Sequence, residues 1–157
     1  MKTARRIITS MLLTACLLFM TACTSYANQS YTFNVNTGEQ IKITLNVKSG
    51  YSLSQKDGQF TICDKENNKI LTGTFLLEGY TDAYRDVVDA DENATVLEDK
   101  KTNGISYLYY EYDGLSGMEH NFIVDIDNAK TGILLASLSS EKEASEAFSL
   151  LTFEKVK

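Results

Sequence analysis

Between positions 41 and 47, apolar and polar residues alternate strictly, which predicts a sheet with one buried and one solvated face. The apolar positions are Ile41, Ile43, Leu45 and Val47, and the residues between them are Lys42, Thr44 and Asn46. Successive side chains of a strand point to opposite faces of its sheet, so a period of two predicts a half-buried strand. A second apolar run at 31–35 precedes it across Asn36-Thr37-Gly38, a sequence typical of a hairpin turn. We therefore expect antiparallel pairing between these two segments.

The rest of the chain predicts further strands and two helices. Strands are expected at 60–63, 70–77, 95–98, 105–112, 121–126 and 132–138. Helical spacing relates a middle set of apolar residues, Tyr80, Ala83, Tyr84, Val87 and Val88, and a C-terminal set, Ala144, Ala147, Phe148 and Leu151. Ser140 and Glu143 have the spacing of a capping box at the start of the second helix. We therefore predict an α+β fold: a mostly antiparallel sheet of about seven strands packed with a middle helix and a C-terminal helix.

This order of elements resembles the PsbP-like fold. The resemblance spans residues 31–156 and rests on the order of strands and helices, on the opening Phe33-Asn34-Val35 and on the closing helix. The same fold is shared by extrinsic photosystem proteins, nuclear-transport cofactors and small bacterial lipoproteins. The resemblance implies an α/β/α sandwich, and it assigns no catalytic residue to this chain.

The first two dozen residues have the three parts of an export signal. A basic start, Lys2, Arg5 and Arg6, is followed by the mostly apolar stretch 7–20 and then by Met20-Thr21-Ala22-Cys23. These residues resemble the lipobox signal of bacterial lipoproteins. The resemblance implies that residues 1–22 are a signal peptide and that Cys23 carries a diacylglycerol thioether and an amide-linked acyl chain. Two or more acyl chains make attachment to a membrane effectively permanent.

This leader has other interpretations. Leu13-Thr14-Ala15-Cys16 also matches a lipobox, but processing there would leave the apolar residues 17–20 at the new N-terminus. A transmembrane anchor is disfavoured because the apolar stretch falls short of the roughly 20 residues that a span needs; ordinary cleavage is the remaining alternative. We therefore expect residues 23–30 to form a polar tether and residues 31–157 to form one domain at the extracytoplasmic face of the cell membrane.

Charge and composition exclude several kinds of partner. The leader holds three of the 15 basic residues and none of the 21 acidic ones, so the chain from Cys23 onward has a net charge of −9. This balance excludes nucleic acid as an expected partner, because binding to phosphates requires basic surfaces. The membrane is therefore expected to be contacted through the lipid on Cys23. Cys63, the remaining thiol, is expected to be a small buried apolar residue.

No metal or cofactor is expected. His120 is the only histidine, which excludes zinc sites with several histidines, and no glycine-rich phosphate loop occurs. Asp82, Asp86 and Asp89 share one side of the middle helix, but their spacing matches no calcium-binding loop. We interpret these three carboxylates as a solvated surface.

The candidate binding residues lie in one predicted strand. Tyr107 and Tyr109 are expected to point to one face of the sheet, and Leu108, Tyr110 and Tyr112 to the other. Burial beneath helices is one interpretation of these rings. If a helix leaves one face uncovered, its tyrosines form an exposed aromatic platform for a peptide, a glycan or a partner protein.

These observations favour a lipid-anchored, extracytoplasmic binding or accessory module of the bacterial cell envelope, without catalysis. One alternative is an envelope hydrolase in which His120 acts with a nearby carboxylate, Glu119 or Asp125. A third hypothesis is a structural subunit of a larger envelope assembly. A pocket converging on His120 would favour the hydrolase, and an extensive hydrophobic surface would favour the structural subunit.

Overall fold

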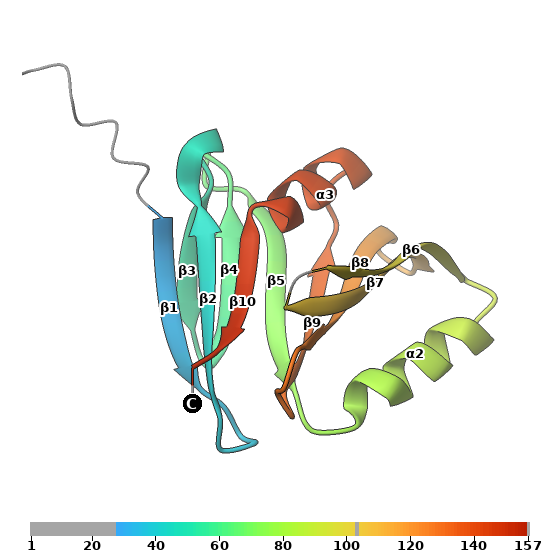
Figure 1. Ribbon diagram of the computed structural model, residues 1–157. Helices are drawn as coiled ribbons and strands as arrows, with labels where there is room; N and C mark the ends of the chain where they lie inside the picture. The colour runs from blue at the N-terminus through green and yellow to red at the C-terminus, as the bar shows by residue number, and fades with distance from the viewer. Residues whose placement is uncertain (1–27, 103, 157) are drawn as a thin grey trace, which may run out of the picture.

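The computed structural model describes residues 28–102 and 104–156, and in chain order they form ten strands and two α-helices (Figure 1). The elements are β1 (Asn28–Asn34), β2 (Gln40–Asn46), the 3₁₀ turn η1 (Val47–Ser49), β3 (Ser52–Lys56), β4 (Gln59–Cys63), β5 (Lys69–Leu76), α2 (Tyr80–Ala90), β6 (Ala94–Thr102), β7 (Ile105–Gly114), β8 (Gly117–Ile126), β9 (Gly132–Ser137), α3 (Glu141–Ser149) and β10 (Leu151–Lys155). The predicted lipidation site, Cys23, lies outside the described residues.

All ten strands pair antiparallel, in two sheets. The larger sheet has the order β3-β4-β5-β9-β8-β7-β6, and the smaller one has the order β1-β2-β10. Figure 1 shows the smaller sheet lying over the β3-β4-β5 part of the larger one, with α3 at one end of this sandwich and α2 beside the β6-β9 part. The predicted α+β class, with a middle and a C-terminal helix, is confirmed.

The main core lies between the two sheets and beneath α3. Ile41, Ile43 and Leu45 of β2 are completely buried in it, as their alternation predicts, and they join Phe60 and Phe122 of the larger sheet. The capping box of α3 is also confirmed, because the Ser140 hydroxyl accepts from the Glu143 amide and the Glu143 carboxylate accepts from the Ser140 amide. Local capping and core burial therefore both position α3 against the sheet.

Several strands differ from the predictions, and the differences at β1, β3 and β10 change the smaller sheet or the edge of the larger one. Residues 28–30, predicted to be tether, are the first part of β1 and pair with 44–46 of β2. β3 and β10 were not predicted. β3 has one buried side chain, Leu53, and β10 has two, Leu151 and Phe153, so neither segment shows a long alternation. β10 nevertheless completes the smaller sheet by pairing with β2.

The middle helix α2 contacts the sheet through an unexpected side. Thr81 and Val88 are its buried residues, and Val88 packs with Leu108, Tyr110 and Ile123 in a second apolar cluster. Between them, the Arg85 guanidinium lies 3.2 Å from an Asp99 carboxylate oxygen and 3.4 Å from one of Asp125. The sheet-facing side of α2 is therefore formed by one small polar residue, one ion-paired residue and one apolar residue.

Gly132 of β9 is expected to be the position at which α2 is most sensitive to added volume. A Cβ there would overlap Thr81 Cγ2 and lie 3.3 Å from the Val124 carbonyl oxygen. Gly132→Ala should therefore lower the free energy of unfolding by about 1–3 kcal/mol, the usual effect of overpacking. Urea denaturation followed by circular dichroism measures this change.

Thr81→Ser is the matched rescue for Gly132→Ala because it removes Cγ2 and keeps the hydroxyl. The double variant should recover most of the stability that Gly132→Ala loses. If Gly132→Ala costs the same stability with and without Thr81→Ser, the overlap with Cγ2 is not the cause.

Candidate functional site: a groove between α3 and the β6-β7 edge

A groove of about 410 Å³ opens between α3 and the β6-β7 edge of the larger sheet. β6 contributes Glu98, Lys100 and Thr102, and β7 contributes Ile105, Tyr107 and Tyr109. Phe122 of β8, the α3 residues Ser145, Phe148 and Ser149, and Leu151 complete the lining. Two of the four candidate tyrosines therefore line one concave surface.

The floor of this groove is a series of contacting aromatic rings. The Tyr109 and Phe122 rings are stacked with centroids 4.3 Å apart, and the Phe122 and Phe148 rings are stacked at 4.1 Å. The Tyr107 ring meets Phe148 edge-on at 4.9 Å. Phe122 is 1% exposed and Tyr109 4%, so these two rings support the half-buried Tyr107 and Phe148 rings, which are the ones that a ligand could contact. Packed rings with few rotatable bonds need little ordering when a ligand binds.

The rim of the groove carries two opposite charges beside the Tyr107 hydroxyl. Tyr107 donates a hydrogen bond of 2.8 Å to the Glu98 carboxylate, which also accepts one of 2.6 Å from the Lys100 ammonium. These two bonds, first that from Lys100, lower the pKa of Glu98, so its carboxylate is ionised at neutral pH. Burial, together with Glu98, raises the pKa of Tyr107 to about 12, so its hydroxyl remains a donor. The rim therefore offers a donor, an ammonium and a carboxylate next to apolar rings.

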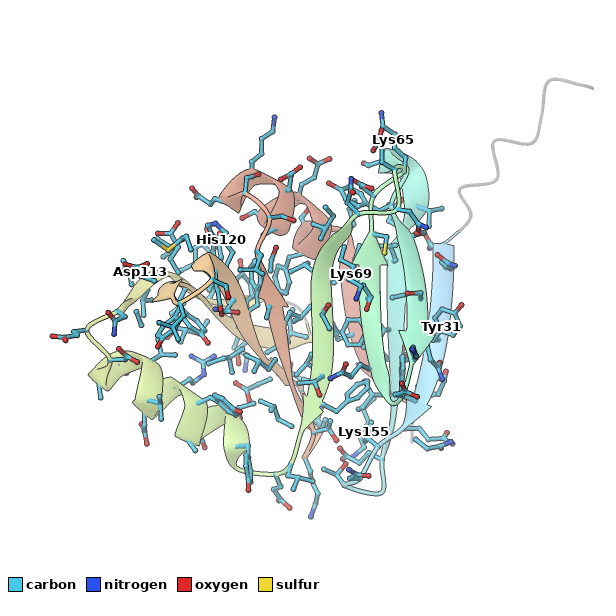
Figure 2. The ribbon with its side chains drawn as sticks, turned by 180° about the vertical axis from the view of Figure 1, so that it is seen from behind. Tyr31, Lys65, Lys69, Asp113, His120 and Lys155 are labelled. Atoms are coloured by element: carbon cyan, nitrogen blue, oxygen red, sulfur yellow. The ribbon has the colours of Figure 1, made fainter. Side chains whose placement is uncertain are left out.

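Behind the groove, the Tyr109 side chain connects to the only histidine. The Tyr109 hydroxyl lies 3.2 Å from His120 Nδ1, which lies 3.6 Å from a Glu111 carboxylate oxygen. His120 is 6% exposed and is not among the residues lining the groove. Figure 2 shows His120 near the end of the β7-β8 hairpin, on the same hairpin as Asp113. The imidazole therefore supports Tyr109 from behind instead of facing the groove.

The four candidate tyrosines lie on opposite faces of the sheet, as the alternation predicts, and each ring is buried or half-buried, so the structure favours the burial interpretation. Tyr107 and Tyr109 face the main core and the groove, and Tyr109 is 4% exposed. Tyr110, 8% exposed, and Tyr112 belong to the cluster beneath α2. Burial raises the pKa of Tyr110 to about 12, with a further contribution from Glu119. Helices lie against both faces, and Tyr107 and Tyr109 are the two candidate tyrosines that line the groove.

The carboxylates predicted to act with His120 lie on the other face of the sheet. Glu119 and Asp125 are odd-numbered residues of β8, whereas His120, like Phe122 and Val124, points to the main core. Asp125 pairs with Arg85 of α2. The carboxylate that does approach His120, Glu111, comes from the neighbouring strand. The arrangement predicted for a hydrolase is therefore not formed by these residues.

Glu98, Lys100 and Phe148 belong to this site but were not predicted as site residues. The sequence placed a strand at 95–98, whereas β6 continues to Thr102 through Lys100 and Lys101. Charged residues are common on edge strands, where they discourage pairing with other chains. That charge pattern at a sheet edge is the signal that could have extended the strand and placed Lys100 beside Tyr107.

Other predicted features can also be placed. Asp82, Asp86 and Asp89 are exposed, as expected for a solvated surface, and Cys63 is a half-buried free thiol. Within residues 28–102 and 104–156, no three His, Cys, Asp or Glu side chains are grouped so as to hold a metal ion. None of the helices in that part of the chain is long and apolar enough to cross a membrane.

Comparison of the chain with protein-family models gave no match, and comparison with curated protein sequences gave none either. The PsbP-like and lipoprotein resemblances therefore remain predictions from the sequence. The groove and the N-terminal signal are the features of the molecule that bear on its function.

Proposed function

We propose that this protein is a lipid-anchored binding or accessory module at the extracytoplasmic face of a bacterial membrane, and that it acts by binding and not by catalysis. Cys23 would carry the lipid, and the groove beside α3 would hold a segment of a peptide or glycan ligand. The observation that carries the proposal is the combination of a stacked aromatic floor with a charged, hydrogen-bonding rim.

The chemistry of the groove supports this choice of ligand. A peptide or a glycan presents apolar surfaces and hydrogen-bonding groups side by side, as the floor and rim require. Tyr107 contributes to both parts, because its ring contacts Phe148 and its hydroxyl meets Glu98. Tyr107 is therefore the residue whose removal should affect binding most.

Photo-crosslinking in the native cells tests the proposal. A photoreactive phenylalanine derivative in place of Thr102, an exposed groove residue, should give a light-dependent adduct with a peptide or glycan in the membrane fraction. Tyr107→Ala in the same chain should lower the adduct yield about fivefold or more, because loss of an aromatic contact costs about 1 kcal/mol or more. Mass spectrometry of the same preparation should show a chain that begins at a lipid-modified Cys23.

Tyr112→Ala is the matched control, because Tyr112 is a half-buried tyrosine of the same strand on the opposite face. This variant should leave the adduct unchanged. The absence of an adduct at position 102 would contradict the groove, and an intact leader or an unmodified thiol at Cys23 would contradict the anchor. A protein adduct that does not depend on Tyr107 would instead favour the structural-subunit hypothesis.

A further inference from the structure

The helix α2 turns its largest apolar side chains away from the sheet. Tyr80 is 52% exposed, Tyr84 37% and Val87 61%, and Ala83 between them is also exposed. These residues follow the i, i+3, i+4, i+7 spacing that normally packs a helix onto a core. We call them the apolar face of α2. Because Thr81, Arg85 and Val88 make the main contacts with the sheet, most of this face is uncovered within residues 28–102 and 104–156. Tyr84 alone lies close enough to Tyr110 to contribute to its raised pKa.

Other exposed apolar side chains lie in the elements next to the helix. Leu77, in the loop that leads into α2, is 46% exposed. Val96 and Leu97 of β6, one of the strands against which α2 packs, are 43% and 38% exposed. Six of the ten exposed large apolar side chains in the described part of the chain thus lie on α2, just before it, or on β6. Apolar side chains concentrated in one region mark interaction surfaces more reliably than scattered ones do.

Negative charge borders the apolar face of α2. Asp86 adjoins this face beside Ala83, and Asp82 and Asp89 lie further round the exposed side of the helix. None of the three forms an ion pair with another described residue. The only basic residue of the helix, Arg85, is engaged by Asp99 and Asp125. The surface is therefore apolar along its length and acidic along one border.

We infer that the apolar face of α2 is a docking surface for an amphipathic, basic segment of another protein. Apolar side chains of that segment would cover Tyr80, Tyr84 and Val87, and its lysines or arginines would meet the three aspartates. Opposite charges across an interface raise the association rate and select the partner. The inference goes beyond the proposed function, because the groove lies on the other face of the sheet.

Two other occupants fit this surface less well. A second copy of the chain would add three more aspartates and no free basic side chain of the helix to the same interface. An anionic membrane would be repelled by the same carboxylates. In addition, β1 begins on the opposite side of the molecule from α2 (Figure 1), and the five residues from Cys23 to Asn28 span at most about 18 Å. Only this last point depends on the proposed lipid anchor.

The test is photo-crosslinking of the full chain in its native cells, with the photoreactive phenylalanine derivative in place of Val87. We expect an adduct whose protein segment, sequenced by mass spectrometry, combines lysine or arginine with apolar residues. Combined substitution of Asp82→Asn, Asp86→Asn and Asp89→Asn should lower the adduct yield about tenfold, because it removes the charge pairs with the basic side chains of the partner. The far-ultraviolet circular dichroism spectrum should remain unchanged.

Substitution of three exposed glutamates elsewhere, Glu141→Gln, Glu146→Gln and Glu154→Gln, is the matched control and should leave the yield unchanged. The inference would be overturned if no adduct formed, or if the adduct contained lipid, a second copy of the chain or an acidic segment. It would also be overturned if the adduct yield did not change when the three aspartates were substituted. The absence of an adduct at position 87 would not affect the adduct expected at position 102, and the reverse also holds. The two proposals are therefore tested independently.

Discussion

Glu39→Gln should lower the free energy of unfolding by about 3 kcal/mol, because Glu39 is a buried carboxylate that holds three segments together. It accepts hydrogen bonds from the amides of Lys130 and Thr131, at 2.9 and 3.0 Å, and from the Thr131 hydroxyl at 2.8 Å. The Lys155 ammonium of β10 lies 2.8 Å from its other oxygen. Figure 2 shows Lys155 at the end of the molecule where the β1-β2 turn lies. The glutamine side chain would lack the negative charge. Its NH₂ group, a hydrogen-bond donor, would face one of the donors that now bind the carboxylate.

The size and sign of this effect follow from the pKa of Glu39. Burial alone would raise this pKa, but the Lys155 ammonium, the Lys130 amide and Thr131 outweigh burial and lower it from 4.5 to about 2. A shift of this size corresponds to about 3 kcal/mol of stability. Because the pKa is lower in the folded state, this stability is present above about pH 4.5 and is lost as the pH falls toward 2.

Urea denaturation at a series of pH values measures this contribution. The difference between the native chain and Glu39→Gln should be largest near neutral pH and should narrow between pH 4.5 and 2. Glu154→Gln is the control, because Glu154 is an exposed β10 carboxylate 3.7 Å from Lys42 and should contribute less than about 0.5 kcal/mol. A Glu39→Gln difference that is independent of pH would contradict the assigned ionisation.

Local patterns predicted the elements in which apolar residues repeat regularly, every second residue in a strand or every third to fourth residue in a helix. β2 and α3 are examples, because Ile41, Ile43 and Leu45 alternate and Ser140 with Glu143 caps the helix. The short strands β3 and β10 were missed because their stability comes from pairing, and the five residues of β10, for example, pair with β2. Residue pattern alone does not reveal such nonlocal pairing.

For the middle helix, spacing predicted the element but not its orientation. Tyr80, Tyr84 and Val87 form the more apolar side, yet the partners of Arg85, which are Asp99 and Asp125, lie on the sheet beneath it. Gly132 also leaves room there for Thr81. Those constraints come from strands distant in sequence, so no local pattern contains them.

The candidate site was predictable only in part. The two-residue turn between Gly114 and Gly117 fixes the β7-β8 register, in which Glu111 faces His120 and Tyr109 faces Phe122. Glycines at both ends of a short connection are typical of a hairpin turn, so the approach of Glu111 to His120 could have been inferred from the sequence. The groove could not be inferred from the sequence, because it depends on how α3 lies relative to β6 and β7.

Phe60→Ala should lower the free energy of unfolding by about 3–5 kcal/mol, the usual cost of removing a core aromatic ring. Phe60 is fully buried, and its ring centroid lies 6.0 Å from that of Phe33 and 5.9 Å from that of Phe75. It pairs with Gly73 across β4 and β5, and a Cβ at Gly73 would overlap the Phe60 ring. Gly73 is therefore glycine because the ring occupies the space of its side chain.

The double-mutant cycle of Phe60 and Gly73 tests this interpretation. In the native background, Gly73→Ala should cost about 1–3 kcal/mol, because Phe33 and Phe75 prevent the Phe60 ring from moving aside. In the Phe60→Ala background, the same substitution should be neutral or stabilising, because the new methyl enters the vacated space and alanine loses less backbone entropy than glycine. Phe60→Leu provides a second, milder background. Urea denaturation measures all of these variants, and an equal cost of Gly73→Ala in every background would show that ring overlap does not explain the glycine.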